Sequence, residues 1–398
     1  MPAPALGDRS LFPDLDAASY LAHCAVAPLA APVAAAPAAP PAAYARAGAG
    51  AVRPAHAAKE ALRAELAAFL GAPCPADVAL TSGTTHGVIA VAQGFPWRAG
   101  DALVLLRGEF PTNVTPWLVA ARHHDLTVRW LDADDLRPGG PGLDRLAALL
   151  ADGRVRLVAA SAVEFQTGLR LPVGALASLA HAHGAALFVD AIQACGVVPL
   201  DVAAAGVDFL ACGAHKWLGG LEGAGFLYVA SHHAPHLRPT LAGWLSHEDP
   251  VGFLFDGPGL LRYDRPLRRR ADVVEAGSAS MVGLAALRAA LGLVTALGVP
   301  AIAAHVAAFH DRFAPTALAL GFTDLRPADP AGRSGILALR PPADLPLAAV
   351  RDGLAARGVV VTAPDGVLRI APHGFTPLAE ADLAAGALAE VAADLRRG

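Results

Sequence analysis

The sequence predicts an α/β protein with a mainly parallel seven-stranded sheet wrapped by helices, followed by a smaller α+β C-terminal domain. Seven apolar runs have the length of buried strands, and helical patterns separate the first five of them. Strands that alternate with helices are typical of a parallel sheet. The seven runs span residues 78–81, 102–106, 126–131, 155–160, 187–190, 207–212 and 225–230.

The same pattern divides the chain into three parts. Residues 46–275 hold all seven runs and are predicted to form a large domain. Beyond Gly277, Leu284, Leu287 and Leu291 follow helical spacing, so residues 276–398 are expected to form the small domain. Residues 1–45 are expected to be an N-terminal segment that packs on the small domain.

Composition favours a cytoplasmic globular protein over a membrane or nucleic-acid protein. Mean hydropathy is +0.45, but alanine supplies much of this excess. The longest stretch without charged residues, 17–45, contains several prolines and cannot be a membrane-spanning helix. The N-terminus lacks the pattern of a signal peptide. A net charge of -4 does not suggest binding to nucleic acid, and four cysteines without a framework spacing predict free thiols.

Only two lysines occur in the chain, and one of them, Lys216, follows a predicted strand. Arginine cannot deprotonate at working pH, whereas a lysine removed from water can form a Schiff base with an aldehyde. Lys59 instead lies in a helical pattern whose apolar face is marked by Leu62, Leu66 and Leu70. Lys59 is therefore expected to be an ordinary solvated lysine, and Lys216 a chemical one.

An acidic residue, Asp190, ends the run 187–190, and Gln193 follows it. The carboxyl edge of a parallel sheet is where ligands bind. Pyridoxal 5'-phosphate (PLP) needs an anion that keeps its ring nitrogen protonated, and Asp190 can supply it. Gln193 could donate a hydrogen bond to the ring's phenolic oxygen. The alternative for Asp190 is an ordinary helix N-cap.

A phosphate site is predicted where the run 78–81 passes into a helical pattern. Ser82, Gly83, Thr84 and Thr85 lie at this junction. Backbone N–H groups at a helix start are unpaired and point toward an anion. The alternative is that these hydroxyl residues are only helix caps.

Six motifs together resemble the class V aminotransferases, a family of fold type I PLP enzymes that includes cysteine desulfurases, kynureninases and isopenicillin N epimerase-like proteins. The likeness runs over most of the chain. The motifs, in order, are Ser82-Gly83-Thr84-Thr85, Glu109-Phe110-Pro111-Thr112-Asn113, Asp190-Ala191-Ile192-Gln193, His215-Lys216, Glu275-Ala276-Gly277-Ser278 and Leu368-Arg369-Ile370-Ala371-Pro372-His373.

The resemblance implies a role for each matched residue. Lys216 would carry PLP as a Schiff base, with Lys216 and Asp190 as the catalytic pair. Ser278 would reach the cofactor phosphate of a partner subunit, which implies a homodimer. The implied cofactor-binding residues are Ser82, Gly83, Thr84, Thr85, Phe110, Asp190, Gln193, His215, Lys216 and Ser278, with Phe110 stacked on the ring.

The substrate implied by the resemblance is an α-amino acid. Arg369 matches the arginine that grips the substrate carboxylate, for which a planar, permanently charged fork is suited. His23 lies in the N-terminal segment that lines the substrate mouth in such enzymes. The alternative for His23 is an ordinary surface histidine.

The motifs favour cleavage beyond Cα, either kynureninase-like or C–S lyase-like. Residues 163–168 and 243–247 look more like the kynureninase side of the family. The four cysteines are Cys24, Cys74, Cys195 and Cys212, so the thiol that a desulfurase carries in its C-terminal half is not matched. Two alternatives stay open, a transaminase of a small amino acid and a non-catalytic PLP-binding partner protein.

Histidines raise the question of a metal, because the chain has 15 of them. None of their groups spells a recognised zinc motif, so no metal site is predicted. The candidate groups are His123-His124, His181-Ala182-His183 and His232-His233-Ala234-Pro235-His236.

Overall fold

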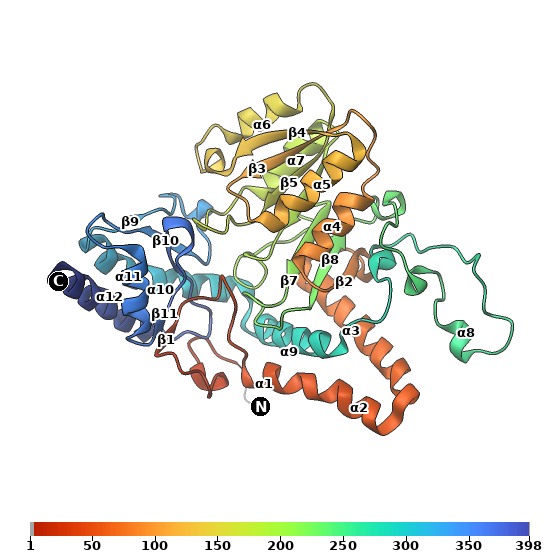
Figure 1. The fold of residues 1–398 in the computed structure, drawn as a ribbon, viewed down its shortest axis with the longest axis horizontal. Helices are drawn as coiled ribbons and strands as arrows, with labels where there is room; N and C mark the ends of the chain where they lie inside the picture. Colours follow the sequence, from red (N-terminus) through yellow and green to blue (C-terminus); the bar gives the residue numbers. More distant parts are fainter. Residues whose placement is uncertain (1–3, 398) are drawn as a thin grey trace.

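The large domain is built on a seven-stranded mixed sheet (Figure 1). The structure is a computed structural model that describes residues 4–397. The strand order is β2-β8-β7-β6-β5-β3-β4, with β8 antiparallel to both neighbours and the other pairs parallel. The predicted mainly parallel sheet is confirmed. The strands are β2 (Val78–Thr81), β3 (Ala102–Arg107), β4 (Thr127–Asp132), β5 (Val155–Ser161), β6 (Ala186–Asp190), β7 (Phe209–Gly213) and β8 (Gly225–Val229).

Helices cover both faces of this sheet because side chains along a buried strand point alternately to the two sides. In β3, Leu103 and Leu105 join one apolar cluster, while Val104 and Leu106 join the other. The first cluster includes residues of α4 and α5, and the second includes residues of α3, α6 and α7. The helices are α3 (Val52–Leu70), α4 (Thr84–Gly94), α5 (Thr115–His124), α6 (Gly142–Leu150) and α7 (Val173–Ala182).

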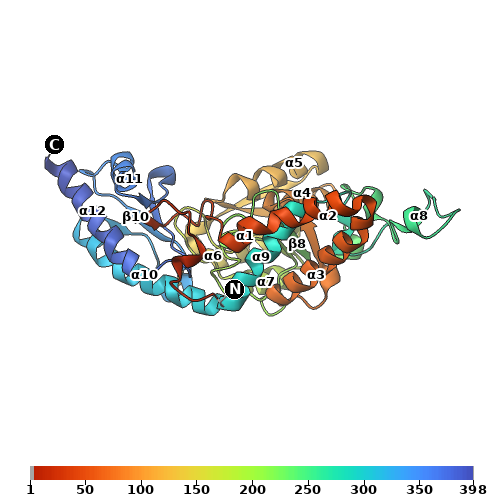
Figure 2. The ribbon, with the colours of Figure 1, turned by 90° about the horizontal axis from the view of Figure 1, so that it is seen from below.

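The C-terminal part has its own antiparallel sheet and its own apolar cluster. Its strand order is β12-β10-β9, and Ala338 of β10 pairs with Arg369 of β12. The long helices α10 and α12 pack against each other beside it (Figure 2). The elements are α9 (Met281–Leu297), α10 (Val299–Ala319), β9 (Thr323–Asp324), β10 (Leu337–Arg340), α11 (Leu347–Ala355), β11 (Val359–Val360), β12 (Leu368–Ile370) and α12 (Ala379–Arg397).

The N-terminal segment contacts both parts. Strand β1 (Ser19–Tyr20) pairs in parallel with β11, and the His23 amide donates to the Ala371 carbonyl at 3.2 Å. On the large-domain side, the Ala27 amide donates to the His215 carbonyl at 2.8 Å. Helices α1 (Ala31–Ala35) and α2 (Ala39–Ala47) lie along α9 (Figure 2). The predicted boundaries at residues 45/46 and 275/276 stay predictions.

The expectation of a solvated Lys59 is wrong. Lys59 is 8% exposed, and its Nζ lies 2.8 Å from Glu275. Arg63 lies one turn further along α3 and contacts the same carboxylate at 2.5 Å. Spacing explains the error, because Lys59, Leu62, Arg63 and Leu66 follow i, i+3, i+4, i+7 and share one buried helix face.

Among residues 4–397, one bent pair of helices is long and apolar enough to cross a membrane. No single helix there has both the length and the apolar character needed to cross a bilayer. Helices α9 and α10 satisfy that test only when taken together, and they are bent by 75° at the break between them.

Candidate active site

A cavity of about 530 Å³ opens at the carboxyl edge of the large sheet. This is the size of a typical small-molecule site. Because β6 and β7 are parallel neighbours, the residues that follow them meet at this edge. The small domain contributes one wall through β12. Predicted site residues lining the cavity are Ser82, Gly83, Thr84, Thr85, Phe110, Asp190, Gln193, His215, Lys216 and Arg369.

Lys216 lies just after β7 and points its amine into the cavity wall formed by Phe110. Its Nζ lies 5.6 Å from the centroid of the Phe110 ring. Burial lowers the pKa of Lys216, and the charge of Asp190 opposes that shift. The amine is therefore easier to deprotonate than an ordinary lysine, as Schiff-base formation requires.

Asp190 is the last residue of β6 and is 3% exposed. One carboxylate oxygen accepts the Ile192 amide at 3.0 Å. Burial raises the pKa of Asp190 to about 6, although the Ile192 hydrogen bond and the charge of Lys216 lower it. The alternative reading as a helix N-cap is wrong, because the described chain has no helix between β6 and β7.

Gln193 is held rigidly beside the cavity. Its Nε2 donates to the Cys24 carbonyl at 2.9 Å, and its Oε1 accepts the Trp217 indole at 2.8 Å. An amide nitrogen has two donors, so one N–H of Gln193 stays available to a ligand. The donation to a phenolic oxygen stays a prediction, and it would use that second N–H.

The start of α4 has the features of an anion site. No acceptor within residues 4–397 receives the amide N–H groups of Thr84, Thr85 or His86, and the first helical bond runs from Gly87 to Gly83. The buried Thr84 hydroxyl also has no partner in this part of the chain. Gly83 has φ +149°, which side chains rarely permit. These free donors fit a phosphate.

Arg369 reaches the cavity from β12 and is 6% exposed. Its Nε donates to the Thr362 hydroxyl at 2.9 Å, and its Nη1 donates to the Phe165 carbonyl at 2.5 Å. Nη2 has no acceptor within the described residues. Two bonds thus fix the guanidinium plane while one end stays free to bind an anion.

Two predicted site residues lie outside the cavity. Ser278 is exposed and lines a separate cavity of about 420 Å³ with Tyr44 and Trp244. His23 is buried under the site, where its Nδ1 lies 3.1 Å from the Ala371 carbonyl and its ring stacks near Trp217. The alternative reading of His23 as a surface residue is wrong, since it is 5% exposed.

Several wall residues were not predicted. Cys24, Phe165 and Glu222 line the cavity from three loops. Glu109 accepts the Ser161 amide at 2.6 Å and the Ser161 hydroxyl, and burial together with the charge of Asp190 raises its pKa to about 8. Glu109 is not among the lining residues, but it had a signal in the sequence because it stands in one of the six motifs.

Solved structures share this fold at low sequence identity. The apo structure of a cysteine desulfurase from Thermococcus onnurineus matches with a TM-score of 0.85 and 22% identity, over 98% of this chain and 100% of that one. A cystine C–S lyase matches with a TM-score of 0.82 and 22% identity, over 94% and 97%. The chain therefore shares the α/β fold of these two enzymes.

The sequence comparisons identify the family. The family model for class-V aminotransferases matches residues 41–366. An uncharacterized aminotransferase of Bacillus subtilis is 30% identical over 92% of each chain, and the isopenicillin N epimerase of Streptomyces clavuligerus is 33% identical over 82% of each. A cysteine desulfurase of Dickeya dadantii is 35% identical over 71% of this chain, but the match spans only 66% of that protein. The chain belongs to the aminotransferase class-V family, as its motifs predicted, and its cofactor is PLP.

Proposed function

We propose that this enzyme binds an α-amino acid and cleaves a bond beyond Cα, in the manner of a kynureninase or a C–S lyase. The observation that carries the proposal is one cavity lined by Lys216, Asp190 and Arg369. An amine, a buried carboxylate and a guanidinium serve cofactor attachment, ring pairing and substrate anchoring respectively. We assign these three roles to the three residues.

The residues that would hold PLP follow from the same cavity. Lys216 would bind its aldehyde, Asp190 its ring nitrogen, and the free amides at the start of α4 its phosphate. Phe110, which is 47% exposed here, would stack on the ring. When bound, PLP supplies a sink for the electron pair left at the substrate Cα.

We also assign to Lys216 the transfer of the proton at the substrate Cα. Its lowered pKa leaves more of the amine neutral, so Nζ can accept a proton from Cα and return it. Asp190 is not assigned this task, because its carboxylate is buried, accepts the Ile192 amide and is proposed to pair with the ring nitrogen. Proton transfer at Cα is therefore assigned to Lys216 alone.

Arg369 is proposed to bind the substrate carboxylate through its free Nη2. A charge-assisted bond of this kind contributes about 1.5–3 kcal/mol. Because Nε and Nη1 are already held by Thr362 and Phe165, little side-chain entropy remains to be lost on binding.

Two observations favour cleavage beyond Cα over transamination. The Phe110 and Phe165 rings meet edge to face at 5.4 Å and give the cavity an apolar wall beside Lys216. That wall suits an aromatic or sulfur-containing side chain. In addition, one relative is named a cysteine desulfurase and one structural neighbour a cystine C–S lyase, and both names refer to sulfur amino acids.

One cysteine is placed where it could accept sulfur from a substrate. Cys24 lines the cavity, and its Sγ lies 3.6 Å from the Thr362 hydroxyl. It is the one cysteine among the residues lining this cavity. If sulfur were passed to the protein, Cys24 would be the acceptor. Cys24→Ser would then stop the formation of alanine from cysteine, whereas simple elimination needs no protein thiol and would still release sulfide and a keto acid.

Transamination is the second candidate, supported by the Bacillus subtilis aminotransferase relative. Both candidates are tested by adding each amino acid to the PLP-loaded protein and following absorbance and products. A lyase restores the starting spectrum and releases alanine or a keto acid. A transaminase leaves the bound cofactor in its amine form until a keto acid is added. A spectrum that responds to no amino acid would indicate the third candidate, a non-catalytic PLP-binding protein.

We further propose a homodimer. The segment that contains α8 (Gly252–Phe255) extends away from the body in both views (Figures 1 and 2). Leu254, Leu261 and Tyr263 on it are 52%, 61% and 91% exposed. Apolar side chains in an extended arm suit a partner surface. Light scattering should give twice the chain mass, and deletion of residues 250–263 should shift it toward the monomer.

A cytoplasmic location is proposed on the state of the thiols. Cys24, Cys74, Cys195 and Cys212 are all free. Free thiols persist in a reducing compartment. Fractionation of the producing cells tests this, and recovery outside the cytoplasm would contradict it.

A further inference from the structure

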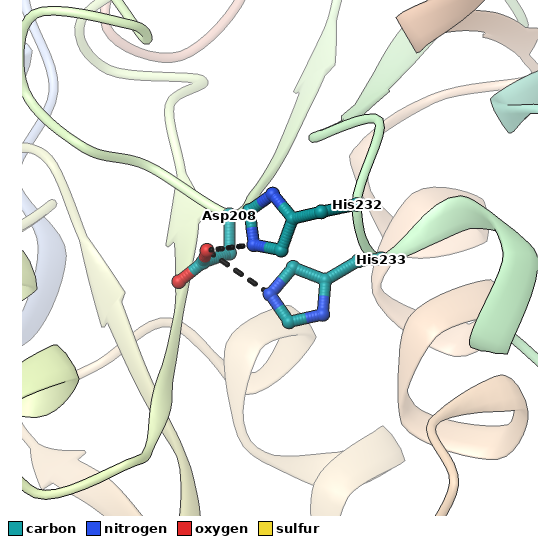
Figure 3. A group of neighbouring side chains, drawn as sticks. All are labelled: Asp208, His232 and His233. Atoms are coloured by element: carbon teal, nitrogen blue, oxygen red, sulfur yellow. Dashed lines mark hydrogen bonds and ion pairs between the residues drawn. The ribbon is translucent and has the colours of Figure 1, made fainter.

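A histidine cluster lies at the end of the large sheet opposite the PLP cavity. Asp208 precedes β7, whereas Lys216 follows the same strand. Because β8 is antiparallel to β7, Val229 pairs with Phe209, and the residues that follow β8 return to Asp208. His232 and His233 therefore meet the Asp208 carboxylate (Figure 3).

The geometry of these three side chains is that of ligands around one point. The His233 Nε2 lies 3.0 Å and the His232 Nε2 lies 3.4 Å from the same oxygen of Asp208, Oδ1. A tetrahedral zinc ion with bonds of about 2.0–2.1 Å holds its ligand atoms roughly 3.3–3.4 Å apart. All three ligand atoms lie within 4.8 Å of one another.

The second oxygen of Asp208 is already positioned. Oδ2 accepts the Leu187 amide at 2.7 Å and the His181 Nε2 at 2.7 Å. Asp208 is 2% exposed, so its carboxylate has one fixed orientation. Metal-binding carboxylates are held in this way by a second layer of hydrogen bonds. His181 would thus orient the ligand without touching the ion.

Charge also favours a cation here. The rings of His232 and His233 pack with centroids 4.2 Å apart. Metal binding requires both imidazoles in their neutral form, which offers a lone pair at Nε2. Two neutral imidazoles and one carboxylate leave a single negative charge, which a divalent ion can neutralise.

We propose that Asp208, His232 and His233 form a binding site for a divalent transition-metal ion, with Zn²⁺ as the best fit. Imidazole and carboxylate ligands suit Zn²⁺, and water would complete the coordination. Each imidazole binds through the Nε2 lone pair, and its ring proton resides on Nδ1. The ion would tie the segment after β8 to the start of β7. The site lies away from Lys216, so it stabilises the fold and does not serve the reaction.

The proposal revises the expectation of no metal site. None of the three histidine groups has a zinc spacing in the sequence. The fold brings two of those groups, His181 and His232-His233, to one aspartate that belongs to neither.

Calorimetric titration of Zn²⁺ into the untagged, chelator-treated PLP-loaded protein tests the site. One ion per chain is expected, and His232→Ala/His233→Ala should weaken binding at least tenfold. The matched control is His123→Ala/His124→Ala, another adjacent histidine pair, at the end of α5, which should bind as the wild type does. His181→Ala should weaken binding by about 10–100-fold, the usual effect of removing an orienting partner.

Two outcomes would contradict the metal site: no Zn²⁺ binding to the wild type, or equal Zn²⁺ binding to the wild type and the His232→Ala/His233→Ala variant. The visible absorbance of bound PLP checks that each variant is folded, because the PLP cavity lies at the other end of β7. Zn²⁺ should also raise the melting temperature of the wild type and not that of the double variant.

Discussion

The Lys216 amine lies 5.6 Å from the centroid of the Phe110 ring, over an aromatic face that opens into the cavity. An aromatic face attracts a cation, while burial favours the neutral amine. The lowered pKa of Lys216 indicates that burial prevails. The same Phe110 ring would stack on the cofactor. The Lys216 amine therefore lies beside the proposed position of the cofactor aldehyde.

Reductive labelling should find Lys216 and not Lys59. Borohydride treatment of the PLP-loaded protein followed by peptide mapping is expected to place the label on the peptide that contains Lys216. Lys59 is an internal control, because its Nζ is buried and lies 2.8 Å from Glu275. Lys216→Ala should abolish the visible absorbance band. Label on Lys59, or an unchanged spectrum in the variant, would contradict the assignment.

PLP affinity should fall as the pH drops below about 6. The pKa of Asp190 is raised to about 6, so below that pH the acid is protonated in the PLP-free protein. Pairing with a protonated ring nitrogen requires the ionised carboxylate of Asp190. Below pH 6, Asp190 must therefore release its proton when PLP binds. Fluorescence titrations from pH 5 to pH 8 measure this slope.

The control for that slope is Asp190→Asn. The phosphate of PLP also titrates near pH 6 and contributes its own dependence. Asparagine does not titrate, so the slope of log PLP affinity against pH should be smaller in the variant by one proton per PLP bound. Equal slopes in the two proteins would show that Asp190 does not pair with the ring.

The sequence predicted what local pattern determines. Runs of apolar residues located the seven strands to within a few residues. Asp190 ends β6, and Lys216 lies shortly after β7. Contacts made by distant segments could not be read in this way. The burial of Lys59 depends on Glu275, which is more than 200 residues away. Cys24 and Phe165 join the cavity only because three loops meet there.

Glu275 should be a major source of stability. Its carboxylate contacts Lys59 and Arg63, and all three side chains are buried. Glu275→Gln removes the carboxylate partner of Lys59 and leaves Arg63 paired with Glu60 alone, and breaking a buried pair costs about 3–5 kcal/mol. Urea denaturation measures this change. Glu65→Gln is the matched control, because Glu65 and Arg288 form an exposed pair and its loss should cost at most about 1 kcal/mol.

The same carboxylate predicts the acid limit of the fold. Lys59 and Arg63 outweigh burial and lower the pKa of Glu275 to about 2. A lowered carboxyl pKa stabilises the folded state fully above the unfolded value near 4.5, and this contribution disappears as the pH falls toward 2. Denaturation curves at pH 2.5 and pH 6 should differ more in the wild type than in Glu275→Gln. Parallel losses would show that other groups set the acid limit.

Arg369→Lys should impair substrate binding more than cofactor binding. Lysine keeps the charge but loses the planar fork, so it cannot contact Thr362, Phe165 and a carboxylate at once. Loss of one charge-assisted bond of about 1.5–3 kcal/mol raises KM roughly 10–100-fold. Arg340→Lys is the control, because Arg340 is exposed on the neighbouring strand β10 and should leave KM unchanged. PLP absorbance should be normal in both variants, which separates a lost anchor from a misfolded domain. A normal KM in Arg369→Lys would mean that another residue binds the carboxylate, since Lys216 is engaged with the cofactor.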